Sequence, residues 1–249
     1  MLVYPPRMPT AAGVMIGDEI LTGKIRDTNV HLLIDTLRAA GVALRRVVTI
    51  RDEIDEIADE VRRCAAAHDH VFTSGGIGPT HDDRTIEGVA RAFGHAVVRD
   101  PALEALVRHH WRERINDAAL KLADLPEGSR LIADDGTRFP VVACRNVYIL
   151  PGIPQLFASK LALVARELHG APPVLQSIYL SGEESAIAAA LTRVVGEVPA
   201  VAIGSYPRIG DPDHKVRITV EGGDRAEVER AVARLLELLP APLVVRVER

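Results

Sequence analysis

Cysteine is scarce in this sequence, and its scarcity excludes a disulfide scaffold. Only Cys64 and Cys144 occur among 249 residues, and neither belongs to a CxxC pair. Isolated cysteines of this kind are typical of reduced, partly buried thiols. No run of about 18 apolar residues is present, so the sequence predicts no membrane span. The first nine residues carry three prolines but no apolar segment, which argues against a secretory signal. We therefore expect a cytoplasmic protein with no membrane partner.

Aromatic residues and positive charge are also in short supply. Aromatics make up 4% of the chain, so the core must be built from Ala, Val, Leu and Ile. That composition suits helices packed on a buried parallel sheet. The formal net charge of −4 argues against a dedicated nucleic-acid binder, which usually carries a basic patch or stripe. A small anionic ligand is still allowed, because backbone dipoles can hold phosphate without net positive charge.

Strand-like and helical segments alternate through the first part of the chain. Strands are expected at 11–16, 42–50, 70–73 and 146–150, with shorter ones near Leu131 and Val141. Helical patterns are expected at 27–40, 53–67, 82–93, 101–123 and 154–168. Such alternation with short links predicts an α/β domain, residues 1–170, with a mostly parallel sheet covered by helices on both faces.

A second, smaller domain is expected at residues 171–249, after the linker Gly170-Ala171-Pro172-Pro173. Its expected strands are 175–180, 200–206, 215–220 and 243–247, and its expected helices are 183–195 and 224–239. This is the βαββαβ order of an α+β, ferredoxin-like domain.

Four distinctive segments follow the predicted strands of the first domain. They are Gly17-Asp18-Glu19, Asp52, the loop Ser74–Asp83 and Pro151-Gly152-Ile153-Pro154. In open α/β sheets, ligands bind outside the carboxyl ends of the strands. We therefore expect these segments to meet in one binding site.

The loop Ser74–Asp83, which we call the glycine loop, has the chemistry of a phosphate cradle. Gly75, Gly76 and Gly78 let the backbone turn sharply and expose its N–H groups, and the predicted helix after them adds a positive dipole end. Further hydroxyl donors are expected from Thr73, Ser74, Thr80 and Thr85. The loop is neither a Walker A loop nor GxGxxG, which disfavours a kinase or a standard dinucleotide fold.

Asp82 and Asp83 have two interpretations. Carboxylates beside a phosphate repel it unless a divalent cation such as Mg²⁺ lies between them, which favours a metal site at this pair. Alternatively, both residues cap the next helix and complement its dipole. Asp52 is open to the same alternative, as a site residue or as the N-cap of its helix. For Arg108, Arg112 and Arg114, a solvated helix face is favoured over a ligand site, and His81, His109 and His110 are expected at the surface.

Three segments together resemble the molybdopterin-binding MoaB/Mog family, in particular its CinA (competence-damage-inducible protein A) branch. They are Gly17–Gly23 with Thr28-Asn29, Gly75–Thr80 with Asp82-Asp83 and Thr85, and Leu150–Pro154. The resemblance implies a three-layer α/β/α sandwich, and it places catalytic roles on Asp83 and Asp52, with Asp82 beside them. The implied ligand-binding residues are Gly17, Asp18, Glu19, Thr28, Asn29, Ser74, Gly75, Gly76, Gly78, Pro79, Thr80, Thr85, Pro151, Gly152 and Pro154.

The chain departs from bacterial CinA proteins in two respects. It lacks their amidohydrolase domain, so that activity is not expected. Its segments Asp135–Val142 and Gly204–Pro207 look more like the molybdopterin-binding-like region of eukaryotic FAD synthetases. The synthetase domain is itself absent, so FAD synthesis is not expected either.

The resemblance implies metal-dependent cleavage of a nucleotide pyrophosphate, FAD or ADP-ribose, with Mg²⁺ or Co²⁺ as the cofactor. The metal would lie at Asp82 and Asp83. Two alternatives stay open: molybdenum-cofactor work, by pterin binding or adenylyl transfer, and a non-catalytic ligand-binding module. The expected partner is a phosphate-bearing small molecule rather than nucleic acid, and family members commonly form homo-oligomers.

Overall fold

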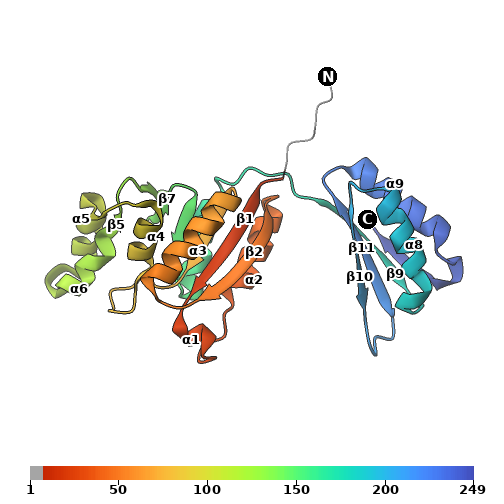
Figure 1. Cartoon of the computed structure of the whole chain (residues 1–249), viewed down its shortest axis with the longest axis horizontal. Coiled ribbons are helices and arrows are strands. Elements are labelled where there is room, and N and C mark those ends of the chain that lie inside the picture. Colours follow the sequence, from red (N-terminus) through yellow and green to blue (C-terminus); the bar gives the residue numbers. More distant parts are fainter. Residues whose placement is uncertain (1–7) are drawn as a thin grey trace, which may run out of the picture. The chain divides into compact units, whose positions relative to one another are not determined.

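The computed structural model describes residues 8–249, so the interpretation of the first residues as lacking a signal lies largely outside it. By its contacts the chain forms two compact units, one ending at Gly170 and the other spanning Ala171–Arg249 (Figure 1). Within the described residues, every helix is too short or too polar to cross a membrane.

A six-stranded mixed sheet forms the centre of the first unit, in the order β2-β1-β3-β8-β7-β6. Its strands are β1 (Thr10–Ile16), β2 (Ala43–Ile50), β3 (His70–Ser74), β6 (Arg130–Ile132), β7 (Val141–Cys144) and β8 (Val147–Leu150). The first four in spatial order are parallel, and β7 and β6 are antiparallel to their neighbours. The sheet is therefore mostly parallel, as predicted.

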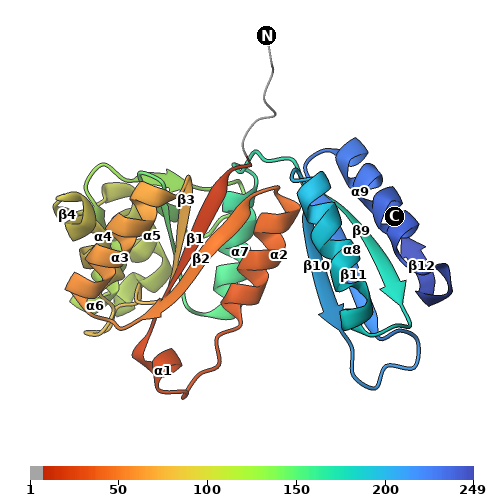
Figure 2. The same ribbon diagram turned by 45° about the vertical axis from the view of Figure 1, so that its right-hand side comes forward.

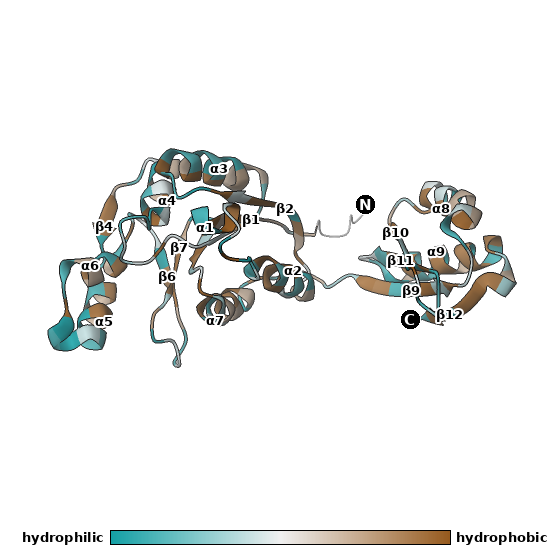
Figure 3. Cartoon of the chain, turned by 90° about the horizontal axis from the view of Figure 1, so that it is seen from below, coloured by the Kyte–Doolittle hydropathy of each residue, from teal (hydrophilic) through white to brown (hydrophobic). Residues whose placement is uncertain are grey.

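Helices cover both faces of this sheet. They are α2 (Asn29–Ala39), α3 (Ile54–Ala67), α4 (Thr85–Phe93) and α7 (Pro154–Ala165). Figure 3 shows α3 and α4 on one side of β1 and β2, and α2 and α7 on the other. This arrangement confirms the predicted three-layer sandwich.

The central strand β1 shows why both faces need covering. All of its residues are buried, and successive side chains point to opposite faces. Met15 packs with Leu33 and Phe157 in the core under α2 and α7. Ile16 packs with Ile57 in the core under α3 and α4. A strand that is buried on both faces has a nearly continuous apolar sequence, which explains why polar and apolar residues do not alternate in β1.

A helical segment and a small second sheet lie beside α4. They comprise α5 (Pro101–Trp111), η1 (Arg112–Arg114), α6 (Asp117–Leu120), η2 (Lys121–Ala123) and the antiparallel pair β4 (Val97–Arg99) and β5 (Asp124–Pro126). The helices were predicted as one region, whereas the two-stranded sheet was not. The strands are only three residues each, too short for periodicity to reveal.

The second unit has its own sheet and core. Its elements are β9 (Val174–Leu180), α8 (Glu184–Glu197), β10 (Ala202–Pro207), β11 (Val216–Gly222), α9 (Arg225–Leu238), η3 (Ala241–Leu243) and β12 (Val244–Glu248). The strand order is β10-β11-β9-β12 with antiparallel pairing throughout (Figure 2). Ile178, Ile187 and Leu235 are among the fully buried residues of its core. The predicted small α+β domain of βαββαβ order is confirmed.

Two element boundaries near the predicted site differ from expectation. Gly17-Asp18-Glu19 is not a simple turn, because α1 (Asp18–Leu21) begins within it. The helix expected from Asp82 begins instead at Thr85. The Thr85 N–H bonds to the Gly76 carbonyl, so the residues between them close into a loop rather than a helical turn.

Candidate functional site

The carboxyl ends of four parallel strands define the candidate site. β1 ends at Ile16, β2 at Ile50, β3 at Ser74 and β8 at Leu150, and these strands are adjacent in the sheet. The helices that follow β1 and β3, α2 and α4, cover opposite faces. The edge between β1 and β3 is thus a topological switch point, where open α/β sheets bind ligands.

Gly75 fixes the position of the glycine loop between two neighbouring strands. Its φ is +104°, a conformation that residues with a side chain rarely adopt. A Cβ atom there would lie 2.2 Å from the Ile16 carbonyl oxygen. Its N–H donates to the Leu150 carbonyl at 3.2 Å. The loop therefore leaves β3 in van der Waals contact with the end of β1, and only glycine fits.

Three successive amides of the glycine loop are available to a ligand. Within residues 8–249, the backbone N–H groups of Gly76, Ile77 and Gly78 donate no hydrogen bond. A Cβ atom on Gly76 would lie 2.4 Å from Thr85 Oγ1 and 3.2 Å from Asp52 Oδ1. The close approach of these side chains leaves no room for one at Gly76. Adjacent N–H groups at a turn before a helix form the type of concavity that binds anions.

Thr85 and Ser74 hold the loop from inside. Thr85 is fully buried, and its hydroxyl donates to the Gly75 carbonyl at 2.8 Å. The hydroxyl of Ser74, also buried, accepts a hydrogen bond from Asn29 Nδ2 at 3.0 Å. The Thr85 proton is committed to the loop backbone, so this residue supports the loop rather than serving as the expected hydroxyl donor to a ligand.

Asp83 folds back on the loop. One of its carboxylate oxygens accepts from the Thr80 N–H at 2.8 Å and also from the Thr80 hydroxyl. Residue Arg84 occupies the N-cap position of α4, and no side chain there caps the helix. The alternative in which Asp82 and Asp83 cap α4 is therefore wrong. Pro79, Thr80 and Asp82 are exposed at the tip of the loop.

Asp52 lies at the centre of the candidate site, whereas the sequence left it as either a site residue or a helix N-cap. Its carboxylate accepts from the Asp18 N–H at 2.9 Å, which ties the end of β2 to the start of α1. Burial raises the pKa of the Asp52 carboxyl, this hydrogen bond lowers it, and the charges of Glu19, Asp18 and Asp82 raise it again. The N-cap of α3 is Glu53, so Asp52 does not cap that helix.

Asn29 links two of the expected segments. It is buried, and its amide group donates to Ser74 Oγ at 3.0 Å and to the Gly152 carbonyl at 2.9 Å. Its side-chain oxygen is buried without a hydrogen-bond partner among the described residues. An acceptor left unpaired at the ligand edge of a sheet is a position where a ligand N–H or O–H would be stabilised.

The remaining expected residues lie around this centre. Gly152 sits against the glycine loop, because a Cβ on it would be 3.2 Å from Gly75 Cα. The N–H of Gly17 bonds to the Ile50 carbonyl at 3.1 Å. Pro154 begins α7, preceded by the half-buried Pro151. Thr28 is exposed at the N-cap of α2 and makes no capping hydrogen bond.

Lys121 is a residue of the site that the sequence did not indicate. Its Nζ donates to the Thr80 carbonyl at 3.3 Å, which joins η2 to the tip of the glycine loop. This contact adds a positive charge beside the acidic residues. Lys121 and Thr80 are 41 residues apart, and no local pattern marks such a pair.

One group of acidic and histidine residues has the spacing of a metal site within residues 8–249, and it is in the second unit. The donor atoms of Asp211, Asp213 and His214 lie within 4.8 Å of one another. Arg246 forms an ion pair with Asp213, so a cation already partners this group. At the glycine loop, no three carboxylate or histidine donors among the described residues come as close together as this.

Known protein families match both units. Residues 12–175 match the family of the probable molybdopterin binding domain, and residues 172–248 match the FAD synthase middle domain. A protein of Archaeoglobus fulgidus is 32% identical over 229 residues, covering 91% of this chain and 96% of that protein.

A probable FAD synthase of Caenorhabditis elegans is 33% identical over 273 aligned residues, covering 96% of this chain and 52% of the relative. The chain thus spans about half the length of that protein. Among solved structures, the protein CinA of Thermoplasma acidophilum, described as of unknown function, is similar with a TM-score of 0.60. It is 30% identical, over 64% of this chain and 98% of that one.

Proposed function

Because the chain belongs to the molybdopterin-binding domain family, with a second unit of the FAD synthase middle-domain type, we propose that it hydrolyses a nucleotide pyrophosphate such as FAD or ADP-ribose. The reaction uses a divalent cation, Mg²⁺ or Co²⁺. The observation that carries the proposal is the meeting of free loop amides with a group of carboxylates at one sheet edge.

The carboxylates supply the donor chemistry that a hard cation needs. Asp18, Glu19 and Asp82 are near enough to Asp52 for their charges to raise its pKa. Such mutual repulsion is relieved by a cation, and oxygen ligands suit Mg²⁺. In this proposal Asp52 rather than Asp83 is at the centre of the group. Within residues 8–249 no three of these carboxylates bring their oxygens within 4.8 Å of one another, so one or two of them would hold the ion together with the substrate phosphate. When bound, the ion would polarise a phosphoryl oxygen and lower the pKa of a water molecule.

The backbone of the glycine loop holds the phosphate. The N–H groups of Gly76, Ile77 and Gly78 are free to donate to phosphate oxygens, and α4 starts just beyond them. The Thr80–Asp83 hydrogen bonds fix the far side of the loop, so Asp83 acts by positioning these amides. The Lys121 ammonium, close to Thr80, offsets part of the negative charge of the site.

The test is release of AMP from FAD and from ADP-ribose, with Mg²⁺, Co²⁺ or EDTA present. We expect cation-dependent AMP release that falls by about 100-fold or more in Asp52→Asn. Asp83→Asn should lower it too, because an amide cannot replace the carboxylate in accepting both Thr80 hydrogen bonds equally well. Asp35→Asn, an exposed change of the same kind on α2, is the matched control. No AMP release above the Asp52→Asn level would overturn the proposal.

A second candidate is work on the molybdenum cofactor, which the family match of residues 12–175 favours. In that case the loop amides bind the phosphate of a pterin. Adenylylated product from ATP and molybdopterin would support this candidate in place of the first. A ligand that raises the melting temperature without being consumed would instead support a non-catalytic module.

Self-association is also part of the proposal. Leu21, Ile25, Ile153 and Leu156 are large apolar side chains left exposed on segments around the site. A surface of this kind favours contact with a second copy of the chain. Sedimentation velocity of the purified protein, with Leu156→Gln as the altered form, tests whether a homo-oligomer exists.

A further inference from the structure

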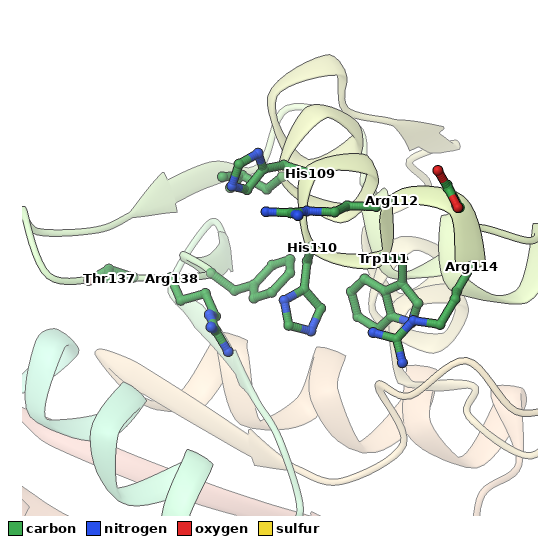
Figure 4. Close-up of a pocket in the computed structure, with 10 residues that line it drawn as sticks. His109, His110, Trp111, Arg112, Arg114, Thr137 and Arg138 are labelled. Carbon is green, nitrogen blue, oxygen red and sulfur yellow. The ribbon is translucent and has the colours of Figure 1, made fainter.

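A groove with an unusual lining lies between the end of α5 and the loop of residues 133–140 that connects β6 to β7 (Figure 4). Its charged lining includes Arg112 and Arg114 from one wall and Arg138 from the other. Its aromatic lining is His110, Trp111 and Phe139. None of these residues belongs to the acidic group at Asp52.

The three arginines are without a protein partner in the described part of the chain. Within residues 8–249, Arg112, Arg114 and Arg138 form no ion pair and no side-chain hydrogen bond, and all are exposed. Nearby arginines behave differently, since Arg108 pairs with Glu104 on the same helix. Glu113 is the acidic residue in the lining, so the groove keeps an excess of positive charge. Arg112 also has a φ of +50°, an uncommon conformation for a residue with a side chain.

The aromatic residues form a three-ring cluster. The His110 and Trp111 ring centroids are 4.4 Å apart with the rings nearly perpendicular, and Phe139 lies 5.8 Å from His110 and 6.1 Å from Trp111. Trp111 and Phe139 pack against the small core under α5, which holds the rings in place. Clusters of this kind offer planar surfaces on which another ring can stack.

The strand pairing places this groove at the ligand edge of the sheet. β7 is antiparallel to β8, with Val142 beside Ile149, so the loop at residues 133–140 lies at the edge where β8 ends. β7 and β6 lie two and three strand positions from β3, which precedes the glycine loop. The groove therefore has its loop wall at the same edge of the sheet as the glycine loop, beside different strands.

We propose that this groove binds a nucleoside 5′-phosphate. Arginine guanidinium groups bind phosphate through paired hydrogen bonds and also stack on planar rings, and the aromatic cluster receives the base. An anionic occupant is favoured because the lining carries three arginines against one acidic residue, Glu113. A planar ring is favoured because Trp111 and Phe139, although they pack on the core under α5, are only partly buried and also line the groove.

Trp111 provides a direct readout, because it is the single tryptophan of the chain. We would titrate the protein with AMP, adenosine and inorganic phosphate and follow tryptophan fluorescence, with Asp52→Asn used in parallel. We expect AMP to change the fluorescence saturably, and adenosine and phosphate to bind at least about tenfold more weakly. An AMP curve that is unchanged in Asp52→Asn but weakened by the groove substitutions below assigns the fluorescence change to the groove rather than to the proposed catalytic site.

Substitutions of the arginines complete the test. Arg112→Gln and Arg138→Gln should each weaken AMP binding at least about fivefold, whereas the matched control Arg108→Gln should not change it. Because Arg138 lies on a separate loop from Arg112, either variant tests the claim if the other fails to fold. Unchanged AMP binding in both variants, or equal binding of AMP and adenosine, would overturn the proposal. Saturable binding of an acidic peptide with no response to AMP would overturn it as well.

Discussion

The Asp18 backbone N–H donates a hydrogen bond to the Asp52 carboxylate at 2.9 Å, and this bond joins the ends of β1 and β2. The same carboxylate lies beside Gly76 of the glycine loop. One side chain that follows β2 thus bonds to the segment after β1 and faces the loop after β3. Its charge is the feature on which both the stability and the proposed chemistry of this edge depend.

Asp52→Asn should raise the melting temperature at neutral pH. Asparagine keeps an oxygen acceptor for the Asp18 N–H but removes a partly buried charge that Glu19, Asp18 and Asp82 repel. Scanning calorimetry of Asp52→Asn and of the exposed Asp35→Asn measures the effect. A lower melting temperature for Asp52→Asn would show that the charge stabilises the fold.

The stability contributed by Asp52 should fall as the pH rises. Its pKa in the folded protein is above its ordinary value of 3.8, so the folded state binds the proton more tightly than the unfolded state. The free energy of unfolding therefore decreases between these two pKa values and stays reduced above the higher one. Denaturant titrations of wild type and Asp52→Asn should differ above this range and converge below about pH 4. Equal pH dependence of the two proteins would contradict the raised pKa.

Gly75→Ala should be much more destabilising than Gly94→Ala. Both residues have positive φ, +104° and +70°, but a Cβ on Gly94 would meet nothing within 4 Å. The change at Gly94 should cost only the backbone strain, roughly 1–2 kcal/mol. At Gly75 the clash with the Ile16 carbonyl oxygen is added, and we expect at least about 2 kcal/mol more. Urea unfolding compares the two, and similar losses would mean that the loop can shift away from β1.

Asn29→Ala should lower the free energy of unfolding by about 1–3 kcal/mol, because Ser74 Oγ and the Gly152 carbonyl lose their donor in a buried setting. His31→Ala, an exposed change on the same helix, serves as the control. The variant should also loosen the link between the glycine loop and residues after β8. A loss no larger than that of His31→Ala would indicate that water replaces the amide.

Lys121→Met should increase the mobility of the glycine loop without unfolding the protein. Its Nζ contact with the Thr80 carbonyl is exposed, so little global stability depends on it. Hydrogen exchange at the Thr80 amide, which is bonded to Asp83, should become faster, while exchange in β1 should be unchanged. Lys24→Met, a change at another exposed lysine, is the comparison. Faster exchange in both variants would point to a general effect of charge.

The meeting of Gly17, Asp52, Gly75 and Gly152 at one edge was predictable, because adjacent parallel strands end on the same side of a sheet. The fold class is confirmed by the sheet topology, and the family resemblance is confirmed by the family match and the similar solved structure. The roles of the individual site residues stay predictions. What the sequence did not reveal are contacts between distant segments.

Asp83 illustrates the limit of prediction from the sequence. From sequence it was an equal member of a metal-binding pair or a helix cap, whereas in the structure its carboxylate is occupied by Thr80. The helix α4 begins at Thr85 rather than at the predicted Asp82, because the Thr85 N–H donates to the Gly76 carbonyl. Lys121 and the groove at Trp111 depend on how α5 and η2 pack, which no local periodicity encodes.

The reversal of direction at β7 has a consequence for how this protein can diversify. The loop of residues 133–140 enters and leaves through the antiparallel strands β6 and β7, so it can change in length or composition while the parallel strands keep their order. Under the two proposals made above, binding at the groove and chemistry at the glycine loop would depend on separate parts of the fold. A graft of a relative's hairpin is then expected to change binding at the groove and to leave the glycine loop intact.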